Sequence, residues 1–321
     1  MRTKSEAIQL MNDWGAQGVP FLFFTDFLAE QIFIRKVEDV SPEEVLYDFN
    51  GVTNSLQKNV SKIKLKKQPI RIETFGLAFD KVIGEIKYGN SFLTNLTFET
   101  PVDCDGSLTD IFHNTRAKYK LRFADQFVCF SPEIFVSISE NQVRSFPMKG
   151  TIDASLPNAR EQILNDPKEL AEHVTIVDLI RNDLSQIATD VRVDRFRYID
   201  EIQTERGKLL QVSSEIVGEL EESWKNALGD LLFSLLPAGS ICGAPKPKTI
   251  RIITSVEAQS RGFYTGVCGL FDGKKLDSGV MIRYIEKRDD QLFYRSGGGI
   301  TAFSDLEKEY QEYMDKIYLP L

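Results

Sequence analysis

Short apolar runs alternate irregularly with helical patterns along this chain. Runs rich in the aromatic and β-branched residues that strands favour occupy residues 21–24, 92–98, 121–130 and 134–138. Ser139-Glu140-Asn141 turns the last of these runs back into a strand at 142–146. Because strands and helices do not alternate strictly, the pattern predicts an α+β fold with largely antiparallel sheet.

A meander of three further strands is predicted near the C-terminus, at residues 266–271, 280–286 and 292–296. Asp272-Gly273 and residues 288–290 are the turn signals that separate these strands. No repeat, low-complexity segment or Pro/Gly/Ser-rich linker divides the chain. We therefore expect residues 1–321 to form a single unit.

Two helices have clear start signals. Asp166-Pro167-Lys168-Glu169 supplies an N-cap acid, a proline at the first helical position and a glutamate, which predicts a helix from Pro167 to about Asp183. Ser304-Asp305-Leu306-Glu307 is interpreted as a capping box that opens the last helix.

Each of these helices carries two glutamates three residues apart: Glu169 and Glu172 on the first, Glu309 and Glu312 on the last. Like charges on one helix face are unfavourable unless a cation lies opposite them. A magnesium site built from two helices would explain both pairs, and solvated helix surface is the alternative. Lys316 follows Glu312 by four residues, a spacing that an ordinary helical ion pair also explains.

Lys149 stands between apolar residues and a glycine in Pro147-Met148-Lys149-Gly150-Thr151. Next to a buried surface its pKa could be lowered so that the amine becomes a nucleophile, whereas a lysine at a strand end more commonly points to water. Glu133 opens the preceding strand of the same predicted hairpin. Apolar neighbours would give it the raised pKa of a general acid, and a solvent-facing glutamate is the alternative.

Arg283 lies inside the apolar run of the second C-terminal strand, where it either faces solvent or requires a carboxylate, because a guanidinium does not deprotonate. Gly297-Gly298-Gly299 follows the next strand. These glycines would allow backbone amides to approach an anion closely, and a flexible turn would also explain them.

Composition excludes several classes of protein. Apolar residues make up 42% and charged residues 27% of the 321 positions, which is typical of a globular protein. The net charge of −8 disfavours nucleic acid and anionic membrane as partners. The four cysteines form no Cys-x-x-Cys pair, and no signal peptide or membrane span is apparent, so we expect a cytoplasmic protein. Neither a Walker loop nor a Gly-x-Gly-x-x-Gly motif is present.

In their order and spacing these segments resemble the chorismate-utilising enzymes, and within that family most closely component I of aminodeoxychorismate synthase, the large subunit of para-aminobenzoate synthase. The resemblance extends from about residue 80 to the end, and residues 1–80 look like a shortened N-terminal part. The segments that carry it are Ser131-Pro132-Glu133, residues 147–151, 169–173, 177–183 and 237–246, Arg261-Gly262-Phe263-Tyr264-Thr265-Gly266, Gly297-Gly298-Gly299-Ile300 and residues 309–316. The fold it implies is a pair of large, mainly antiparallel β-sheets packed face to face with helices outside.

The resemblance also implies roles for the candidate residues. Chorismate would bind with Mg²⁺, and the implied ligands are Glu172 and Glu312, with Glu169 and Glu309 completing the acidic cluster. Few protein carboxylates are expected, because magnesium keeps several waters. The implied binders of the substrate are Tyr264, Arg283, the amides of Gly297, Gly298 and Gly299, and nearby Thr151, Ser240 and Lys316.

Through the resemblance, the presence of Lys149 implies which reaction of the family this chain catalyses. Anthranilate synthases usually have alanine at its position, whereas the similar aminodeoxychorismate synthases use this lysine to attack C2 of chorismate while Glu133 protonates the departing 4-hydroxyl. Ammonia from a glutamine amidotransferase subunit then attacks C4. Isochorismate and salicylate synthases place a lysine in the strand that here comprises residues 91–97, which contains none. The alternatives are an anthranilate synthase component I and, less expected, a non-enzymatic ligand-binding protein.

Two departures from the family pattern stand out. Many relatives have a histidine where this chain has Gln211, ahead of the Ser214-x-x-x-Gly218 element, and the role of Gln211 stays open. The chain also lacks much of the N-terminal region in which larger relatives hold a tryptophan pocket, so no feedback site is inferred.

Overall fold

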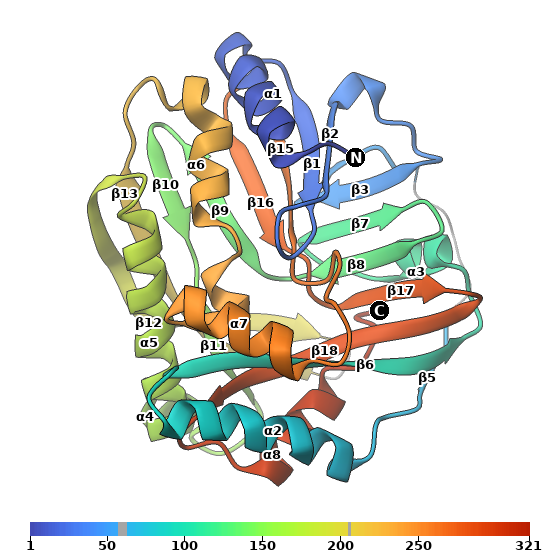
Figure 1. Ribbon diagram of the computed structural model, residues 1–321, viewed down its shortest axis with the longest axis vertical. Helices are drawn as coiled ribbons and strands as arrows, with labels where there is room; N and C mark the ends of the chain where they lie inside the picture. The colour runs from blue at the N-terminus through green and yellow to red at the C-terminus, as the bar shows by residue number, and fades with distance from the viewer. Residues whose placement is uncertain (57–62, 205–206) are drawn as a thin grey trace.

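The computed structural model describes residues 1–56, 63–204 and 207–321, and its strands form two large antiparallel sheets (Figure 1). The first sheet has the order β11-β13-β10-β9-β16-β15-β1-β2, with β12 paired to β13. Its strands are β1 (Phe21–Thr25), β2 (Ile32–Lys36), β9 (Ile134–Ser139), β10 (Gln142–Ser145), β11 (Met148–Asp153), β12 (Thr189–Thr204), β13 (Gly207–Glu219), β15 (Val267–Phe271) and β16 (Leu276–Val280).

The second sheet has the order β14-β6-β18-β17-β8-β7-β3-β4, with β5 paired to β6. Its strands are β3 (Val45–Phe49), β4 (Val52–Thr53), β5 (Leu65–Lys67), β6 (Leu93–Cys104), β7 (Tyr119–Phe123), β8 (Phe127–Ser131), β14 (Gly243–Ala244), β17 (Tyr284–Arg288) and β18 (Gln291–Thr301). Every strand pairing in both sheets is antiparallel.

Helices cover the outer faces of the two sheets. The first sheet carries α1 (Lys4–Gln17), α4 (Ala159–Asn165), α5 (Pro167–Leu184) and α6 (Leu228–Leu235), and the second carries α2 (Ile72–Lys87), α3 (Leu108–Asn114), α7 (Lys246–Val256) and α8 (Leu306–Asp315). Short 3-10 turns are η1 (Val37–Asp39), η2 (Trp224–Ala227) and η3 (Gly239–Ile241). Figure 1 shows α2 and α8 below β6 and β18, and α5 beside β12 and β13. No helix in the described ranges is long and apolar enough to cross a bilayer.

The sheets face each other across an aromatic core. Phe24 of the first sheet stacks on Phe33 with ring centroids 4.7 Å apart, and meets Phe127 of the second sheet edge to face at 5.7 Å. Separate apolar cores lie between each sheet and its helices. This arrangement confirms the predicted α+β fold of two antiparallel sheets packed face to face with helices outside.

The N-terminal strands are integral to both sheets. β1 pairs with β15 in the first sheet, and β3 pairs with β7 in the second. Residues before position 80 therefore complete the same two sheets that carry the motifs.

Two predicted strands are wrong because each is split. The run at 121–130 is the hairpin of β7 and β8, turned at Ala124, whose φ is 44°. The run at 280–286 belongs to two sheets: β16 ends at Val280 in the first, and β17 begins at Tyr284 in the second. A run of apolar residues looks continuous because both segments are buried, so the predicted single meander is a crossing between sheets.

The helix starts are close to prediction. α5 runs from Pro167 to Leu184, and Asp166 caps it by accepting the Glu169 N–H at 3.0 Å. At α8 the N-cap is Asp305, which accepts the Lys308 N–H at 3.1 Å. The predicted cap, Ser304, instead accepts the Thr301 N–H at 3.1 Å.

Candidate active site

The glutamate pairs of α5 and α8 approach the same point on β18. A methyl group placed on Gly298 would lie 3.3 Å from Glu312 Oε1 and 3.6 Å from Glu309 Oε2. One placed on Gly299 would lie 3.7 Å from Glu172 Oε2. Carboxylates of both helices raise the pKa of Lys149, so the two acid pairs belong to one electrostatic cluster around this strand.

Gly150 brings Glu169 into the same region. Its φ of 81° and a register shift make a bulge in β11, and a methyl group there would lie only 3.0 Å from Glu169 Oε2. A glycine is needed at this position because a side chain would meet both a strained backbone and the glutamate. The bulge lets β11 pass directly beneath α5.

The edge of β18 is open where the glycines lie. β17 pairs with β18 only as far as Arg295, and no described strand covers that edge at residues 296–301. The Gly297 carbonyl accepts from Lys316 Nζ at 2.8 Å, so the polar backbone groups of Gly297 point away from β6 toward this edge. The glycines thus lie inside a strand rather than in a turn after it, and the backbone groups of Gly297 and Gly299 can face a ligand while those of Gly298 point to β6.

Lys149 lies on β11 with its Nζ 3.3 Å from Glu172 Oε2. Burial opposes the positive charge, but nearby carboxylates, Glu172 first, outweigh it and raise the pKa of Lys149. A methyl group on Gly299 would lie 3.3 Å from this Nζ. The lysine therefore faces the acidic cluster in its charged form, and the neighbouring acids oppose the lowering of its pKa that a nucleophile needs.

Glu133 and Lys149 do not lie across one hairpin. Glu133 precedes β9, which pairs with β10, whereas β11 pairs with β13 at the edge of the sheet. The chain passes through Pro147 out of the hairpin before Lys149. The two side chains nevertheless interact electrostatically, because Lys149 lowers the pKa of Glu133.

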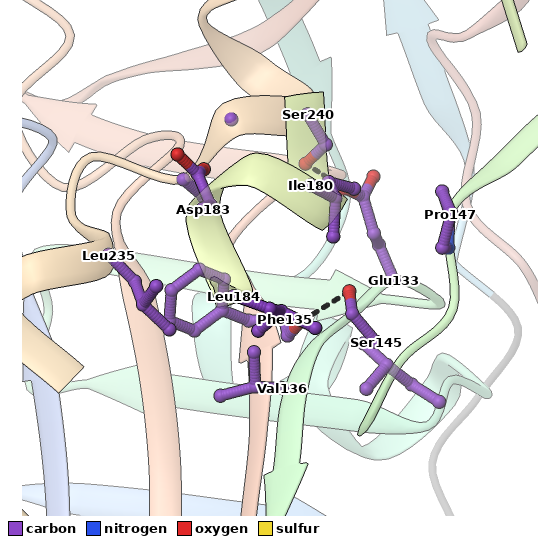
Figure 2. Close-up of a pocket in the computed structure, with 13 residues that line it drawn as sticks. Glu133, Phe135, Val136, Ser145, Pro147, Ile180, Asp183, Leu184, Leu235 and Ser240 are labelled. Atoms are coloured by element: carbon purple, nitrogen blue, oxygen red, sulfur yellow. Dashed lines mark hydrogen bonds between the residues drawn. The ribbon is translucent and has the colours of Figure 1, made fainter. Parts of the chain in front are cut away.

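Glu133 accepts a hydrogen bond from the Ser240 hydroxyl on η3. Burial raises the pKa of its carboxyl, although this hydrogen bond and the cations Lys149, Arg283 and Lys316 oppose the rise. Figure 2 shows Glu133 and Ser240 beside a mainly apolar cavity of about 20 Å³, with Asp183 on the other side. The low-dielectric wall on this side favours a protonated carboxyl.

Arg283 stands at the crossing between the sheets, with a φ of 52°. Its guanidinium lies over the Tyr318 ring, 5.3 Å from the centroid, and forms no ion pair with a carboxylate of the described residues. Tyr264 is buried nearby, and burial raises its pKa to about 12. A guanidinium kept among phenols suits the carboxylate of a substrate.

Lys316 and Thr151, two of the predicted substrate-binding residues, differ in their contacts with the charged residues of the site. Lys316 contacts Glu312 Oε1 at 2.6 Å, which is the helical ion pair that the spacing allows. Thr151 is exposed on β11, opposite Gln211 of β13. Among the described residues it makes no hydrogen bond with the charged groups above, and its role in substrate binding stays a prediction.

His173 ends the motif segment 169–173, but sequence reasoning assigned it no role in the site. This histidine is buried next to Glu172 on α5, and its Nε2 lies 2.7 Å from Ser214 Oγ. Burial, with Arg197 and Lys149 nearby, lowers its pKa to about 4, so it is neutral. Ser214 therefore has a histidine partner from a helix.

The glutamate carboxylates are the type of ligand that Mg²⁺ prefers, but few of them lie together. Among the described residues no three His, Cys, Asp or Glu side chains are placed to hold a metal together. Glu172 and Glu312 each contact a lysine, and both raise the pKa of Lys149, so they act on one region. Mg²⁺ prefers oxygen ligands and usually takes only one or two carboxylates plus waters and substrate oxygens, so this donor set fits.

Comparison with known proteins identifies the family. The family model described as chorismate binding enzyme matches residues 26–321. This chain belongs to the chorismate-binding enzymes. The match begins well before residue 80, in agreement with the place of the N-terminal strands in both sheets.

Relatives within the family bear different names. A Haemophilus influenzae protein called "Uncharacterized PabA-like protein" is 47% identical over 99% of this chain and 98% of its own length. Anthranilate synthase component 1 of Archaeoglobus fulgidus is 34% identical, over 89% of this chain and 70% of its own. Aminodeoxychorismate synthase component 1 of Bacillus subtilis is 29% identical, over 78% and 55%. These relatives support the family and leave the individual reaction open.

The fold agrees with a solved structure. The menaquinone-specific isochorismate synthase of Escherichia coli superposes with a TM-score of 0.75 at 15% identity, covering 98% of this chain and 81% of the other. Identity this low supports the fold alone.

Proposed function

We propose that this chain replaces the 4-hydroxyl of chorismate with ammonia, as component I of aminodeoxychorismate synthase does, and so serves para-aminobenzoate and folate biosynthesis. The observation that carries the proposal is Lys149, an amine 3.3 Å from Glu172 and facing Gly299. A lysine here distinguishes this reaction from that of the anthranilate synthases, which the family resemblance associates with alanine.

The proposed route has two displacements. Neutral Lys149 attacks C2 of chorismate, both conjugated double bonds of the ring shift by one position, and the C4–O bond breaks as Glu133 gives its proton to the departing hydroxyl, forming water. Ammonia then attacks C4, both double bonds shift back, and the C2–N bond breaks to return Lys149 as a neutral amine. The new ammonium group of the product can return a proton to Glu133, so protons balance.

The raised pKa of Lys149 sets a condition on this route, because only the neutral amine attacks. Bound Mg²⁺ would supply positive charge to the Glu172 and Glu312 carboxylates and to the substrate carboxylate. With its acidic partners so occupied, Lys149 loses the carboxylate contacts that hold its proton. Arg283, Tyr264 and the open amides of β18 would orient the substrate.

We also propose that ammonia comes from a separate glutamine amidotransferase subunit. Glutamine hydrolysis needs a thiol that ionises readily. Burial raises the pKa of Cys242 to about 12, raises that of Cys268, and raises that of half-buried Cys104. The purified chain should therefore use ammonium and not glutamine, and glutamine-dependent turnover by the chain alone would contradict this.

An anthranilate synthase activity is the second candidate, because the Archaeoglobus relative is the more identical of the two named enzymes. The products separate the two reactions: anthranilate forms with loss of pyruvate, whereas 4-amino-4-deoxychorismate retains the side chain.

The decisive experiment is the product spectrum of Lys149→Ala with chorismate, Mg²⁺ and ammonium. We expect at least a hundredfold loss of the 4-amino product, with any remaining flux diverted to direct attack of ammonia at C2. Lys248→Ala removes an exposed lysine of α7 and is the matched control. Unchanged rate and product in Lys149→Ala would refute the assignment.

A further inference from the structure

Asn95 on β6 has a side chain that makes no hydrogen bond within the described residues, and its Oδ1 is fully buried. Buried polar side-chain atoms are nearly always hydrogen-bonded, and one that is not calls for an explanation such as an absent ligand or water.

The backbone of Asn95 is held firmly. Its N–H donates to the Cys242 carbonyl at 2.8 Å, and its carbonyl accepts from Arg261 Nη2 at 2.9 Å. Arg261 is itself fixed by Glu257, which also accepts from Thr97 two residues along β6. The unpaired amide is therefore presented on a rigid strand.

The register places this amide over Gly299. Asn95 is opposite Gly299 in the pairing of β6 with β18. The two strands lie side by side in Figure 1. Since both backbone polar groups of Asn95 point toward Cys242 and Arg261, the pair is of the non-hydrogen-bonded kind, in which opposite side chains project to one face at the shortest distance.

The same face carries Lys149. A methyl group on Gly299 would lie 3.3 Å from Lys149 Nζ and 2.9 Å from Leu93 Cδ1. Leu93 is two residues before Asn95 and so shares its side of the strand. The Leu93 side chain and Lys149 Nζ therefore lie directly over Gly299, on the side of the sheet to which the Asn95 side chain projects.

We propose that Asn95 binds the ammonia that attacks the substrate, its amide oxygen accepting one N–H. This inference rests on the proposed function and adds a residue that positions the nucleophile. A neutral acceptor suits the task because a carboxylate here would favour unreactive ammonium, while the Leu93 side chain leaves an entering water without a second polar partner from β6. The expected cost of losing one such hydrogen bond is about tenfold in affinity.

The test measures KM for ammonium and KM for chorismate separately in Asn95→Leu, which has a similar shape and no acceptor. We expect KM for ammonium to rise about tenfold while KM for chorismate changes less than twofold. Asn95→Ala should behave likewise and serves if the leucine variant folds poorly. Asn95→Asp keeps an acceptor but favours unreactive ammonium, so we expect its KM for ammonium to stay within threefold of wild type while kcat falls.

Thr97→Val is the matched control, because its hydroxyl lies on the same face and is already paired with Glu257. An unchanged KM for ammonium in both Asn95→Leu and Asn95→Ala, or a parallel rise in both KM values, would overturn the role of Asn95 while leaving the proposed function intact. If the wild-type chain forms no aminated product from ammonium at all, the proposed function fails and this role fails with it.

Discussion

Arg261 and Arg283 are both guanidinium groups in the interior, and their surroundings are opposite. Arg261 is 2% exposed and donates to Glu257 at 2.6 and 2.9 Å and to the carbonyls of Ile241 and Asn95 at 2.9 Å. Arg283 has a strained backbone, a tyrosine beneath it and no carboxylate partner among the residues described. Glu257 neutralises the charge of Arg261, whereas no carboxylate of the described residues forms an ion pair with Arg283.

This difference in surroundings indicates a structural role for Arg261 and a functional role for Arg283. Arg261 joins the end of α7, η3 and β6 through bonds that are all internal, so it holds the walls of the site. Arg283 cannot lose its charge and needs an anion. No carboxylate of the described residues forms an ion pair with Arg283, and we therefore propose that Arg283 binds the substrate and that Arg261 belongs to the scaffold.

The largest effect is expected from Arg261→Met. Removing the cation leaves Glu257 buried and uncompensated, which should lower the free energy of unfolding by about 3–5 kcal/mol. Chemical denaturation measures this, and Arg261→Met with Glu257→Gln should recover part of the loss because no charge is then stranded. A decrease of less than about 1 kcal/mol in the free energy of unfolding of Arg261→Met would contradict the structural role of Arg261.

Substitution of the site glutamates should have the opposite effect to Arg261→Met, because it should lower activity strongly and stability little. Glu172→Gln or Glu312→Gln should lower Mg²⁺-dependent turnover at least a hundredfold, because a carboxylate ligand is lost. The midpoint of thermal unfolding without Mg²⁺ should stay within a few degrees, because the repulsion relieved between neighbouring acids offsets the ion pair lost with Lys149 or Lys316. Glu161→Gln on α4 is an exposed control. Wild-type turnover and Mg²⁺ dependence in either variant would reject the metal assignment.

The parts of the site that the sequence predicts are those with local signals. Proline and capping acids mark the start of α5, and the spacing of Glu169 and Glu172 follows directly from the helical period. The strand and helix pattern gives the fold class for the same reason, because alternation and periodicity are properties of neighbouring residues.

What the sequence does not predict depends on long-range pairing. The run at 280–286 has one continuous apolar pattern, although Val280 and Tyr284 are buried in different sheets. Lys149 and Glu133 look like hairpin partners, although β13 and β10 lie between their strands. Asn95 is an ordinary strand asparagine until its register opposite Gly299 is known. No local pattern distinguishes Arg261 from Arg283 either.

Arg283→Met tests the other half of the comparison. Because Arg283 makes no internal ion pair with the described residues, its loss should change the free energy of unfolding by less than about 1 kcal/mol. Loss of a charge-assisted contact to the substrate carboxylate should raise KM for chorismate about 10- to 100-fold. Steady-state kinetics and denaturation measure both. A destabilisation like that of Arg261→Met, with KM unchanged, would make Arg283 a second scaffold residue.

The smallest effect concerns Ser240→Ala. The Ser240 hydroxyl donates to Glu133, and this bond lowers the pKa of a carboxyl that burial otherwise raises. Without the bond the ionised form loses a stabilising donor, so the pKa of Glu133 should move to higher pH, by less than about one unit. Titration of the glutamate side-chain carbons by NMR measures the shift, and Glu133→Gln identifies the resonance by its absence. Turnover should fall less than tenfold, because Glu133 keeps the proton that the departing hydroxyl takes. A lower pKa of Glu133 in Ser240→Ala would mean that the Ser240 hydroxyl accepts a hydrogen bond from protonated Glu133. The proton of Glu133 would then be held by Ser240 rather than by burial.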